Sequence, residues 1–270
     1  MNGTELTPVQ RIGDYWFKRD DLFETCGVHG GKARAAYDQI TKAVSDGFNG
    51  IATAGARESP QCEIVSSICE KLGIRCALFM PSGKPTSVME NICGNRLSTI
   101  FPQRARYNNV LCSRARKYAL ENGWFYVPFG MESVETVRTT SKQVQNIPDG
   151  VNRIVCPVGS GMSMASILNG LSHFGRYDVE VVGVQVGKRA EKTVRRFYGD
   201  CDSKKIRFSL VDSGVDYHKP ASLTNFCGID LDPIYEAKCV PFLEQGDLLW
   251  IVGHRKHTTI GQIKQGRKYV

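Results

Sequence analysis

The sequence has no uninterrupted apolar run of about 18 residues, the minimum for a membrane-spanning helix. Its first residues are polar and lack the apolar core of a secretory signal peptide. It also lacks internal repeats, low-complexity tracts and a linker rich in proline, glycine and serine. These absences argue against secretion and against a membrane partner, and they predict a protein that works in the cytoplasm.

Metal-binding and disulfide patterns are missing as well, although the chain has 10 cysteines. Cys62, Cys69 and Cys76 recur every seven residues, but there is no C-x-x-C pair and no histidine close by. This spacing does not suit a zinc site, and nothing indicates an oxidising compartment. We therefore expect reduced thiols that pack as small apolar side chains, and no bound metal.

What the sequence does have is ordinary globular composition with an excess of positive charge. Hydrophobic residues make up 41% of the 270 residues and charged residues 23%, which excludes a disordered or fibrous chain. The length suffices for one large domain or two smaller ones. Lys and Arg number 35 against 27 Asp and Glu, a formal net charge of +8, which favours an anionic partner.

Short runs rich in β-branched and aromatic residues alternate with segments of helical periodicity along the chain. The alternation predicts an α/β fold with parallel-rich sheets flanked by helices. Ligands in such folds bind at the carboxyl ends of strands, so the chemistry is expected in the strand-to-helix loops. Strands are predicted over Tyr15–Lys18, Gly50–Thr53, Arg75–Met80, Ser98–Phe101, Trp124–Val127, Arg153–Pro157, Val179–Val186 and Leu248–Val252. Helices are predicted around Ala36–Val44 and Ile64–Leu72, and over Ser113–Glu121, Ser133–Gln145 and Ser163–Leu171.

One loop places Gly30 and Gly31 before Lys32 at a predicted helix start. It differs from a phosphate-binding P-loop, because Cys26 stands where that motif needs glycine and Ala33 where it needs serine or threonine. What remains is a lysine at a helix N-terminus, where the helix dipole favours a neutral, nucleophilic amine. A solvated first-turn lysine is the alternative.

Two further loops follow predicted strands. The small residues of Gly159–Ser163 let backbone N–H groups converge at a helix N-terminus, which suits one phosphate group; a plain tight turn is the alternative. In the other loop, Ser59 fits an N-cap and Pro60 the first helical position, with Gln61 next. That arrangement is complete as a structural explanation.

A fourth segment runs from Asp232 to Lys238. Asp232 fits an N-cap followed by proline, which predicts a helix with Tyr235 and Glu236 in its first turn. Glu236 then either complements the helix dipole or takes part in chemistry.

In chain order these loops resemble those of the fold-type II pyridoxal-phosphate enzymes, which have a two-domain fold like the tryptophan synthase β-subunit. Within this group the sequence is similar to the 1-aminocyclopropane-1-carboxylate deaminase and D-cysteine desulfhydrase family. The similarity is carried by Thr7-Pro8, Phe17–Leu22, the Gly-Gly-Lys-x-Arg turn, Gly55–Gln61, the Gly-Ser-Gly loop and Asp232–Lys238. The resemblance implies the cofactor pyridoxal 5′-phosphate. It also implies deaminase, lyase or decarboxylase activity at the α-carbon of an amino acid or amino-acid moiety, bound to the cofactor as an external aldimine.

The resemblance also assigns roles position by position. Lys32 would form the Schiff base with the cofactor aldehyde, and Ser59, Tyr235 and Glu236 would be the other catalytic residues. Glu236 would lie by the pyridine nitrogen, and Ser59 and Gln61 would bind the substrate. The phosphate would be held by Gly159, Ser160, Gly161, Met162 and Ser163.

The sequence departs from the family in two turns. Pro60 stands where the family has asparagine, and Gly30-Gly31 precedes Lys32 where the family reads Gly-Gly-Asn. The altered pocket suggests a bulkier substrate. The resemblance further implies a large cofactor domain of residues 1–46 and 130–270, a small domain of residues 47–129, a cofactor between them, and a homodimer.

Three functions remain open at this point. The enzyme acts on a free amino acid, or it acts on an amino acid attached to a modified base of DNA, or the chain binds the cofactor without turnover. Short relatives among bacteriophage gene products suggest the second, which would place the protein in an infected bacterial host. The positive charge agrees with it, and we expect DNA to contact Arg114, Arg116, Lys117, Lys192, Arg195 and Arg196.

Overall fold

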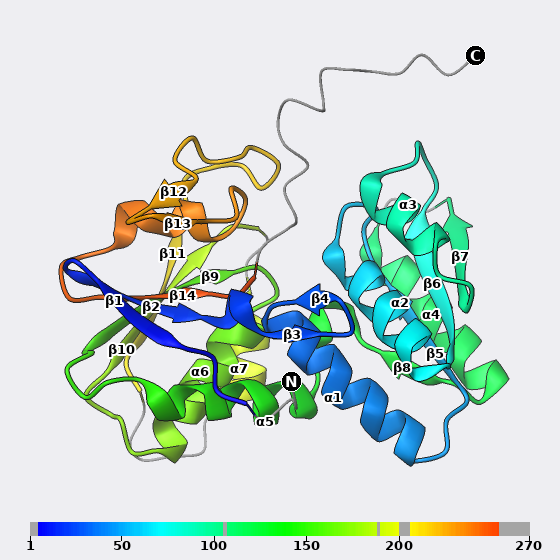
Figure 1. Ribbon diagram of the computed structural model, residues 1–270, viewed down its shortest axis with the longest axis horizontal. Coiled ribbons are helices and arrows are strands. Elements are labelled where there is room, and N and C mark those ends of the chain that lie inside the picture. The colour runs from blue at the N-terminus through cyan, green and yellow to red at the C-terminus, as the bar shows by residue number, and fades with distance from the viewer. Residues whose placement is uncertain (1–4, 105–106, 188–189, 200–205, 254–270) are drawn as a thin grey trace.

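The computed structural model describes residues 5–104, 107–187, 190–199 and 206–253. Two sheets lie side by side in it, with α1 between them (Figure 1). The larger is six-stranded in the order β1-β2-β14-β9-β10-β11 and is parallel except for the β1–β2 pair. Its strands are β1 (Val9–Ile12), β2 (Tyr15–Arg19), β9 (Arg153–Val158), β10 (Glu180–Gln185), β11 (Phe208–Asp212) and β14 (Leu248–Ile251).

The smaller sheet is four-stranded and wholly parallel, in the order β7-β6-β5-β8. Its strands are β5 (Gly50–Ala54), β6 (Arg75–Pro81), β7 (Ser98–Gln103) and β8 (Phe125–Val127). Two short hairpins stand apart, formed by β3 (Glu24–Thr25) with β4 (Val28–His29) and by β12 (Asn225–Phe226) with β13 (Ile229–Asp230).

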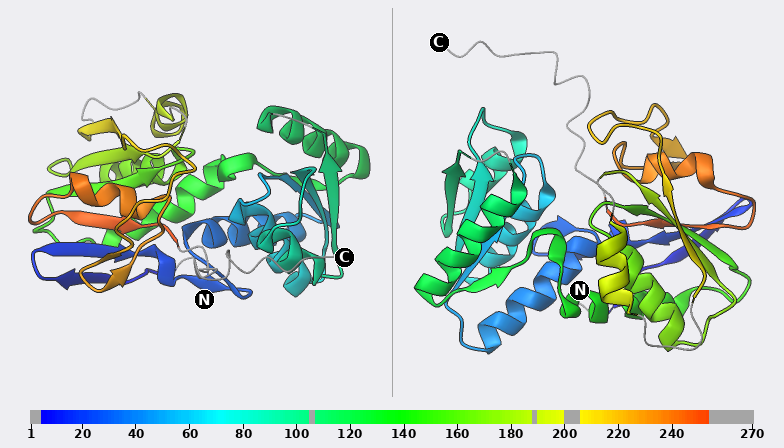
Figure 2. Two further views of the ribbon diagram at one scale, coloured as in Figure 1. Left: turned by 90° about the horizontal axis from the view of Figure 1, so that it is seen from above. Right: turned by 180° about the vertical axis from the view of Figure 1, so that it is seen from behind.

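Helices cover these sheets (Figure 2). The α-helices are α1 (Gly31–Ser45), α2 (Pro60–Leu72), α3 (Ser87–Cys93), α4 (Asn108–Asn122), α5 (Val134–Ser141), α6 (Met162–His173) and α7 (Glu191–Tyr198). Short 3-10 helices are η1 (Asp20–Leu22), η2 (Phe129–Met131), η3 (Lys142–Asn146) and η4 (Glu236–Phe242). Within the described ranges, no helix is both long and apolar enough to cross a membrane.

The central strands of each sheet are buried on both faces, and successive side chains point to opposite faces. In the smaller sheet Ile51 packs with α1 and α2, whereas Ala52 packs with α4. In the larger sheet Ile154 packs with α6, whereas Val155 packs with η4. Burial on both sides makes such strands near-continuous apolar runs, which is why the sequence predicts them well.

The predicted α/β fold class and all the predicted strands are confirmed, with ends shifted by one or two residues. The sequence did not predict β1, β11, α3, α7 and the two hairpins, which are short. The predicted helix Ser133–Gln145 is divided, because α5 gives way to η3 at Lys142. Every cysteine in the described part of the chain is a free thiol.

The predicted helix start at Asp232 is wrong. The Asp232 carboxylate accepts hydrogen bonds from the N–H groups of Ile234 and Tyr235, at 2.8 and 3.1 Å, and so closes a tight turn. Tyr235 then has φ −113° and ψ −85°, outside the helical range, and the helix that follows is η4 from Glu236. Asp232 thus caps a turn instead of a helix.

The predicted domain boundaries, 1–46 with 130–270 and 47–129, stay a proposal. All strands of the smaller sheet fall within residues 47–129. Helix α1, which the prediction assigns to the large domain, packs its apolar residues in the same core cluster as α2. Residues 254–270 of the predicted large domain lie outside the described residues.

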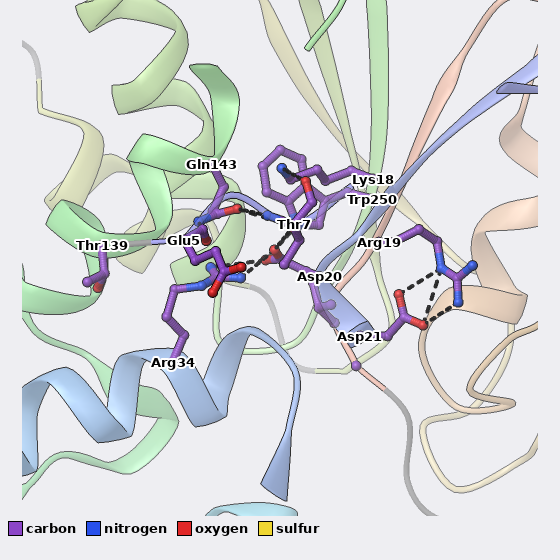
Figure 3. A network of polar contacts seen from close by, with 12 residues as sticks. Glu5, Thr7, Lys18, Arg19, Asp20, Asp21, Arg34, Thr139, Gln143 and Trp250 are labelled. Atoms are coloured by element: carbon purple, nitrogen blue, oxygen red, sulfur yellow. Dashed lines mark hydrogen bonds and ion pairs between the residues drawn. The ribbon is translucent and has the colours of Figure 1, made fainter. Parts of the chain in front are cut away.

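A buried polar network holds the first turn of α1 (Figure 3). Asp20 forms an ion pair with Arg34 and accepts hydrogen bonds from Thr7 Oγ1, at 2.8 Å, and Trp250 Nε1, at 3.2 Å. Asp20 and Arg34 are 1% and 0% exposed, so water does not replace these contacts. Because Arg34 lies two residues after Lys32, the network fixes the start of α1 against β14 and the N-terminal segment.

We predict that Asp20→Asn destabilises the protein by about 3 kcal/mol, because the variant leaves the Arg34 guanidinium buried without its counter-charge. Urea unfolding at neutral pH measures the change. Asp46→Asn, which removes the partner of exposed Lys42, is the matched control and should unfold like the wild type. Equal midpoints for Asp20→Asn and the control would contradict the role given to the network.

Candidate active site

One cavity is lined by residues that the chain brings from both sides of α1. The β4 and α1 region, α2, the start of α6, the turn before η4 and the end of β14 all contribute to it. Three of these segments follow the carboxyl ends of β5, β9 and β14, where ligands of α/β folds bind. The lining residues are His29, Lys32, Pro60, Ile64, Ser163, Asp232, Tyr235, Val252 and Gly253.

The turn before Lys32 packs tightly on the backbone that follows β14. Gly31 N–H donates to the Val252 carbonyl oxygen, at 2.8 Å. Gly30 has φ +91°, and a Cβ there would lie 2.8 Å from the same oxygen. Both the backbone angle and the space require glycine at this position. The two glycines therefore bring Lys32, in the first turn of α1, to the cavity.

Glu236 binds the other side of the same backbone segment. Its Oε1 accepts hydrogen bonds from the N–H groups of Val252, at 2.9 Å, and Gly253, at 3.4 Å. Its Oε2 is buried and has no hydrogen-bond partner. Burial, followed by the nearby charge of Asp232, raises the pKa of Glu236 well above its usual range, and the two backbone N–H groups only partly offset this.

The unpartnered oxygen is the observation that tests the expected cofactor. A protonated ring nitrogen would donate a hydrogen bond to Oε2 and place a positive charge beside a carboxylate that burial otherwise disfavours. Glu236 is not among the lining residues, but it binds Val252 and Gly253, which are. Its carboxylate therefore fits the pyridine nitrogen of pyridoxal 5′-phosphate, which is the position that the sequence predicts for it.

The loop Gly159–Ser163 joins β9 to α6 and borders the cavity. A Cβ at Gly159 would lie 3.0 Å from Cε1 of Tyr235, so this glycine lets the tyrosine ring lie against the loop. Gly161 has φ +93° and starts α6. Ser163 lines the cavity, whereas the Met162 side chain is 3% exposed. The loop fits a phosphate through its backbone N–H groups and the Ser163 hydroxyl.

Ser160 connects this loop to the segment after β8. Its Oγ donates to the Gly130 carbonyl oxygen, at 3.3 Å. A Cβ at Gly130 would lie 2.8 Å from Ser160 Cβ, and Gly130 has φ +70°. The close approach of the two backbones therefore depends on glycine at position 130.

The structure does not bring Ser59 and Gln61 to the cavity lining. The Ser59 side chain accepts a hydrogen bond from Gln61 N–H at 3.4 Å, which confirms it as the N-cap of α2. The amide of Gln61 is 1% exposed: Nε2 donates to Thr53 Oγ1 and the Pro128 carbonyl, and Oε1 accepts from Gly130 N–H. Gln61 therefore positions the 128–130 segment, instead of offering its amide to a substrate.

Sequence reasoning missed several residues near the cavity. His29 and Ile64 line it without any motif to indicate them, and Val252–Gly253 follow a strand whose carboxyl end was a usable signal. Tyr217 is also close, since its hydroxyl lies 3.0 Å from that of Tyr235. Lys238, 2% exposed, holds the Tyr217 loop by donating to the Asp216 carbonyl oxygen at 2.7 Å.

The raised pKa of Glu236 predicts a pH dependence of stability for the cofactor-free protein. The folded state keeps this proton at a pH at which the unfolded chain, with a pKa near 4.5, has lost it. The contribution to stability is therefore full below pH 4.5 and falls as pH rises toward the folded-state pKa. Cofactor-free Glu236→Gln should match the wild type near pH 5 and unfold at a higher temperature near pH 8.

Thermal unfolding of the cofactor-free proteins across this range measures the effect. Glu191→Gln, at an exposed position on α7, is the control and should follow the wild-type curve. A constant difference between Glu236→Gln and the wild type at all pH values would contradict the prediction.

Comparisons with known proteins show the family of the chain. Residues 1–224 match the sequence family described as pyridoxal-phosphate dependent enzymes. A Thermotoga maritima protein provisionally named 1-aminocyclopropane-1-carboxylate deaminase is 26% identical, and the match covers 86% of each chain. The O-seryl-dTMP PLP-dependent decarboxylase of Salmonella phage ViI is 25% identical over 58% of this chain and 43% of its own length.

The crystal structure of a homologue of 1-aminocyclopropane-1-carboxylate deaminase superimposes with a TM-score of 0.77. It is 21% identical and the match covers 94% of this chain and 90% of the other, which shows a common fold. The predicted fold class, cofactor and enzyme class are thereby confirmed. The family match extends over most of the sequence, and the chain belongs to the pyridoxal-phosphate dependent enzymes.

Proposed function

We propose that this enzyme holds pyridoxal 5′-phosphate on Lys32 and breaks a bond to the α-carbon of an amino acid or amino-acid moiety. The observation that carries the proposal is the buried Oε2 of Glu236, which has no partner and lies on the same backbone segment that anchors the Lys32 turn. A structural lysine turn alone has no need of such a carboxylate.

The residues divide the work as follows. When bound, the cofactor supplies an electron-withdrawing ring that accepts the electron pair of the broken bond. Glu236 keeps a proton on the ring nitrogen, and residues 159–163 bind the phosphate. Tyr235 lies against Gly159 and lines the cavity, so it would contact the bound cofactor. The Lys32 amine binds the cofactor aldehyde and, once released, carries a proton to or from the α-carbon.

Ser59 and Gln61 are proposed in revised roles. Ser59 starts α2, and Gln61 holds the segment to which Ser160 is bonded, so both support the cavity from outside its lining. A homodimer, which rests on the resemblance, and a cytoplasmic location, which rests on the sequence, also stay proposals.

We predict that borohydride reduction of the purified protein attaches the cofactor to Lys32, and that Lys32→Ala loses both this label and the visible absorbance of the bound cofactor. Peptide mapping by mass spectrometry identifies the labelled residue. Lys42→Ala, at an exposed position on the same helix, is the control and should keep both signals. Labelling of Lys18 or Lys238 would contradict the assignment.

A second candidate function is action on an amino acid attached to a nucleotide or to DNA. Helix α7 carries Lys192, Arg195 and Arg196, all exposed. Its start packs on the predicted phosphate loop, because a Cβ at Gly161 would lie 3.0 Å from Val194 and 3.2 Å from Ala190. A polyanion bound along α7 would therefore lie next to the cofactor site.

Helix α4, which carries Arg114, Arg116 and Lys117, lies on the same side of the molecule as α7. Seen from behind in Figure 2, α4 (green) and α7 (yellow-green) both face the viewer. Burial raises the pKa of Glu132, and the charge of Arg196 partly opposes this shift. Burial also raises the pKa of Cys112, which Arg116 lowers and Glu132 raises further, so charges of both helices act on one region. The phage relative, whose name specifies a nucleotide-linked serine, supports this candidate.

Competing ion pairs on these helices are weak. Arg195 pairs with Glu191 at 2.9 Å and Lys117 with Glu121 at 3.6 Å, and all four side chains are more than half exposed. Exposed pairs of this kind contribute little, so phosphate groups can replace the carboxylates.

We predict that the protein binds duplex DNA with a Kd of roughly micromolar order at low salt, and that affinity falls steeply as salt rises. Replacing Lys192, Arg195 and Arg196 by alanine should weaken binding about tenfold at ~50 mM salt and reduce the salt dependence, because fewer counterions are released. Fluorescence anisotropy of a labelled duplex measures both. The Lys42, Lys71 and Lys84 triple alanine variant removes equal charge from other elements and should bind like the wild type. Equal losses in both variants would contradict the α7 site.

A further inference from the structure

The cavity has one apolar wall, formed by α2. Among the described lining residues, α2 contributes Pro60 and Ile64, which lie one helical turn apart. Pro60 has no N–H group, and Ile64 has no polar side-chain atom. This wall therefore offers a bound carboxylate no hydrogen bond from its lining side chains.

The donors of Gln61, which follows Pro60, are already engaged. Gln61 N–H donates to Ser59 Oγ, and both amide hydrogen bonds of Gln61 Nε2 go to Thr53 and Pro128. The first two helical positions of α2 thus present no N–H to the cavity, unlike an ordinary helix N-terminus. The α2 side chains that line the cavity are therefore apolar even though a helix begins there.

The polar lining belongs to the other elements. Lys32, Ser163, Tyr235 and Asp232 come from α1, α6 and the turn before η4, and His29 comes from β4. Lys32, Ser163 and Tyr235 are the groups that the proposed function assigns to the cofactor. A substrate whose amine replaces Lys32 has to place its remaining α-carbon groups in the space that includes the α2 wall.

We infer that the substrate's α-carboxylate lies against Pro60 and Ile64, and that the bond broken is the one between the α-carbon and this carboxylate. A carboxylate that loses water without gaining hydrogen bonds is raised in free energy. Loss of carbon dioxide removes that charge, so the apolar wall favours decarboxylation over removal of the α-proton, which would leave the carboxylate in place. The inference rests on the proposed function.

The step is balanced without an oxidant or reductant. The bond between the α-carbon and the carboxylate breaks, carbon dioxide leaves, and the electron pair of that bond is held by the bound cofactor. The α-carbon then takes a proton from the Lys32 ammonium group, which regains one from water. The products are carbon dioxide and the primary amine that corresponds to the amino acid.

The test uses the cofactor-loaded enzyme with two pairs of probes: L-serine with ethanolamine, and O-seryl-dTMP with its decarboxylated amine. Titration of the cofactor absorbance gives a Kd for each probe. We expect each amine to bind at least tenfold more tightly than its amino acid, because the amine brings no charge to the α2 wall. Tighter binding of both amino acids would overturn the inference.

A second measurement compares the two competing bonds. Carboxyl-labelled substrate in deuterated water reports carbon dioxide release by the label and removal of the α-proton by exchange. For whichever of the two amino acids reacts faster, we expect carbon dioxide release to exceed exchange of the α-proton at least tenfold. Exchange or ammonia release that exceeds carbon dioxide release would overturn the inference. The inference would also be overturned if neither amino acid reacted with unreduced enzyme from a preparation in which borohydride treatment of a separate sample labels Lys32.

Pro60→Asn adds a side-chain donor and an N–H group to the wall, and Pro60→Ala adds the N–H group alone. The ratio of carbon dioxide release to exchange should fall about tenfold in Pro60→Asn and less in Pro60→Ala. An unchanged ratio in both variants, with Lys32 still labelled by borohydride, would overturn the role of the wall. If borohydride did not label Lys32 in the wild type, the proposed function itself would be refuted. Failure of the inference can therefore be distinguished from failure of the proposed function.

Discussion

The peptide groups of Val252 and Gly253 hold the candidate active site together, because two parts of the site bind the same short backbone segment. The Val252 carbonyl accepts from Gly31 N–H, which places the Lys32 turn. The Val252 and Gly253 N–H groups donate to Glu236, which orients its carboxylate and leaves Oε2 unpartnered. Since this segment continues β14, in the middle of the larger sheet, a change in that strand would displace the lysine and the carboxylate together.

Two buried polar groups fix the elements that surround this segment. Asp20 joins the first turn of α1 to Trp250 of β14, so the helix that carries Lys32 cannot slide along the sheet. Gln61 joins β5 to the segment at Gly130, whose carbonyl in turn accepts from Ser160 of the phosphate loop. The smaller sheet is thereby connected to the cofactor loop through two buried hydrogen bonds and one part-buried bond, and buried bonds are costly to leave unmade.

The distribution of polarity around the cavity gives each side a separate task. Charged and hydroxyl groups gather where a cofactor would be held, and the α2 side is apolar. The positive charge lies outside, on α4 and α7, where it can attract an anion without entering the cavity. A substrate with an amino acid at one end and phosphate at the other would meet both environments in one orientation.

Features that depend on neighbours along the chain can be predicted from the amino-acid sequence alone. Strands buried on both faces appear as apolar runs, Ser59 and Pro60 start a helix by local hydrogen bonding and a fixed backbone angle, and two glycines indicate a close approach before Lys32. The family resemblance, which rests on short motifs, extended this to the cofactor and to Glu236. These features could be predicted because each depends on only a few neighbouring residues.

Contacts between elements that are distant in the sequence determine which side chains face the cavity and which are hydrogen-bonded elsewhere. Gln61 meets Gly130 across a separation of 69 residues, and Trp250 meets Asp20 across 230, so no local pattern contains these contacts. The contacts of Gln61 keep its amide out of the cavity lining, where α2 contributes Pro60 and Ile64. The packing of β14 likewise places the N–H groups of Val252 and Gly253 within hydrogen-bond distance of Glu236. The physical reason is that a buried polar group takes whichever partner the packing of distant elements offers it.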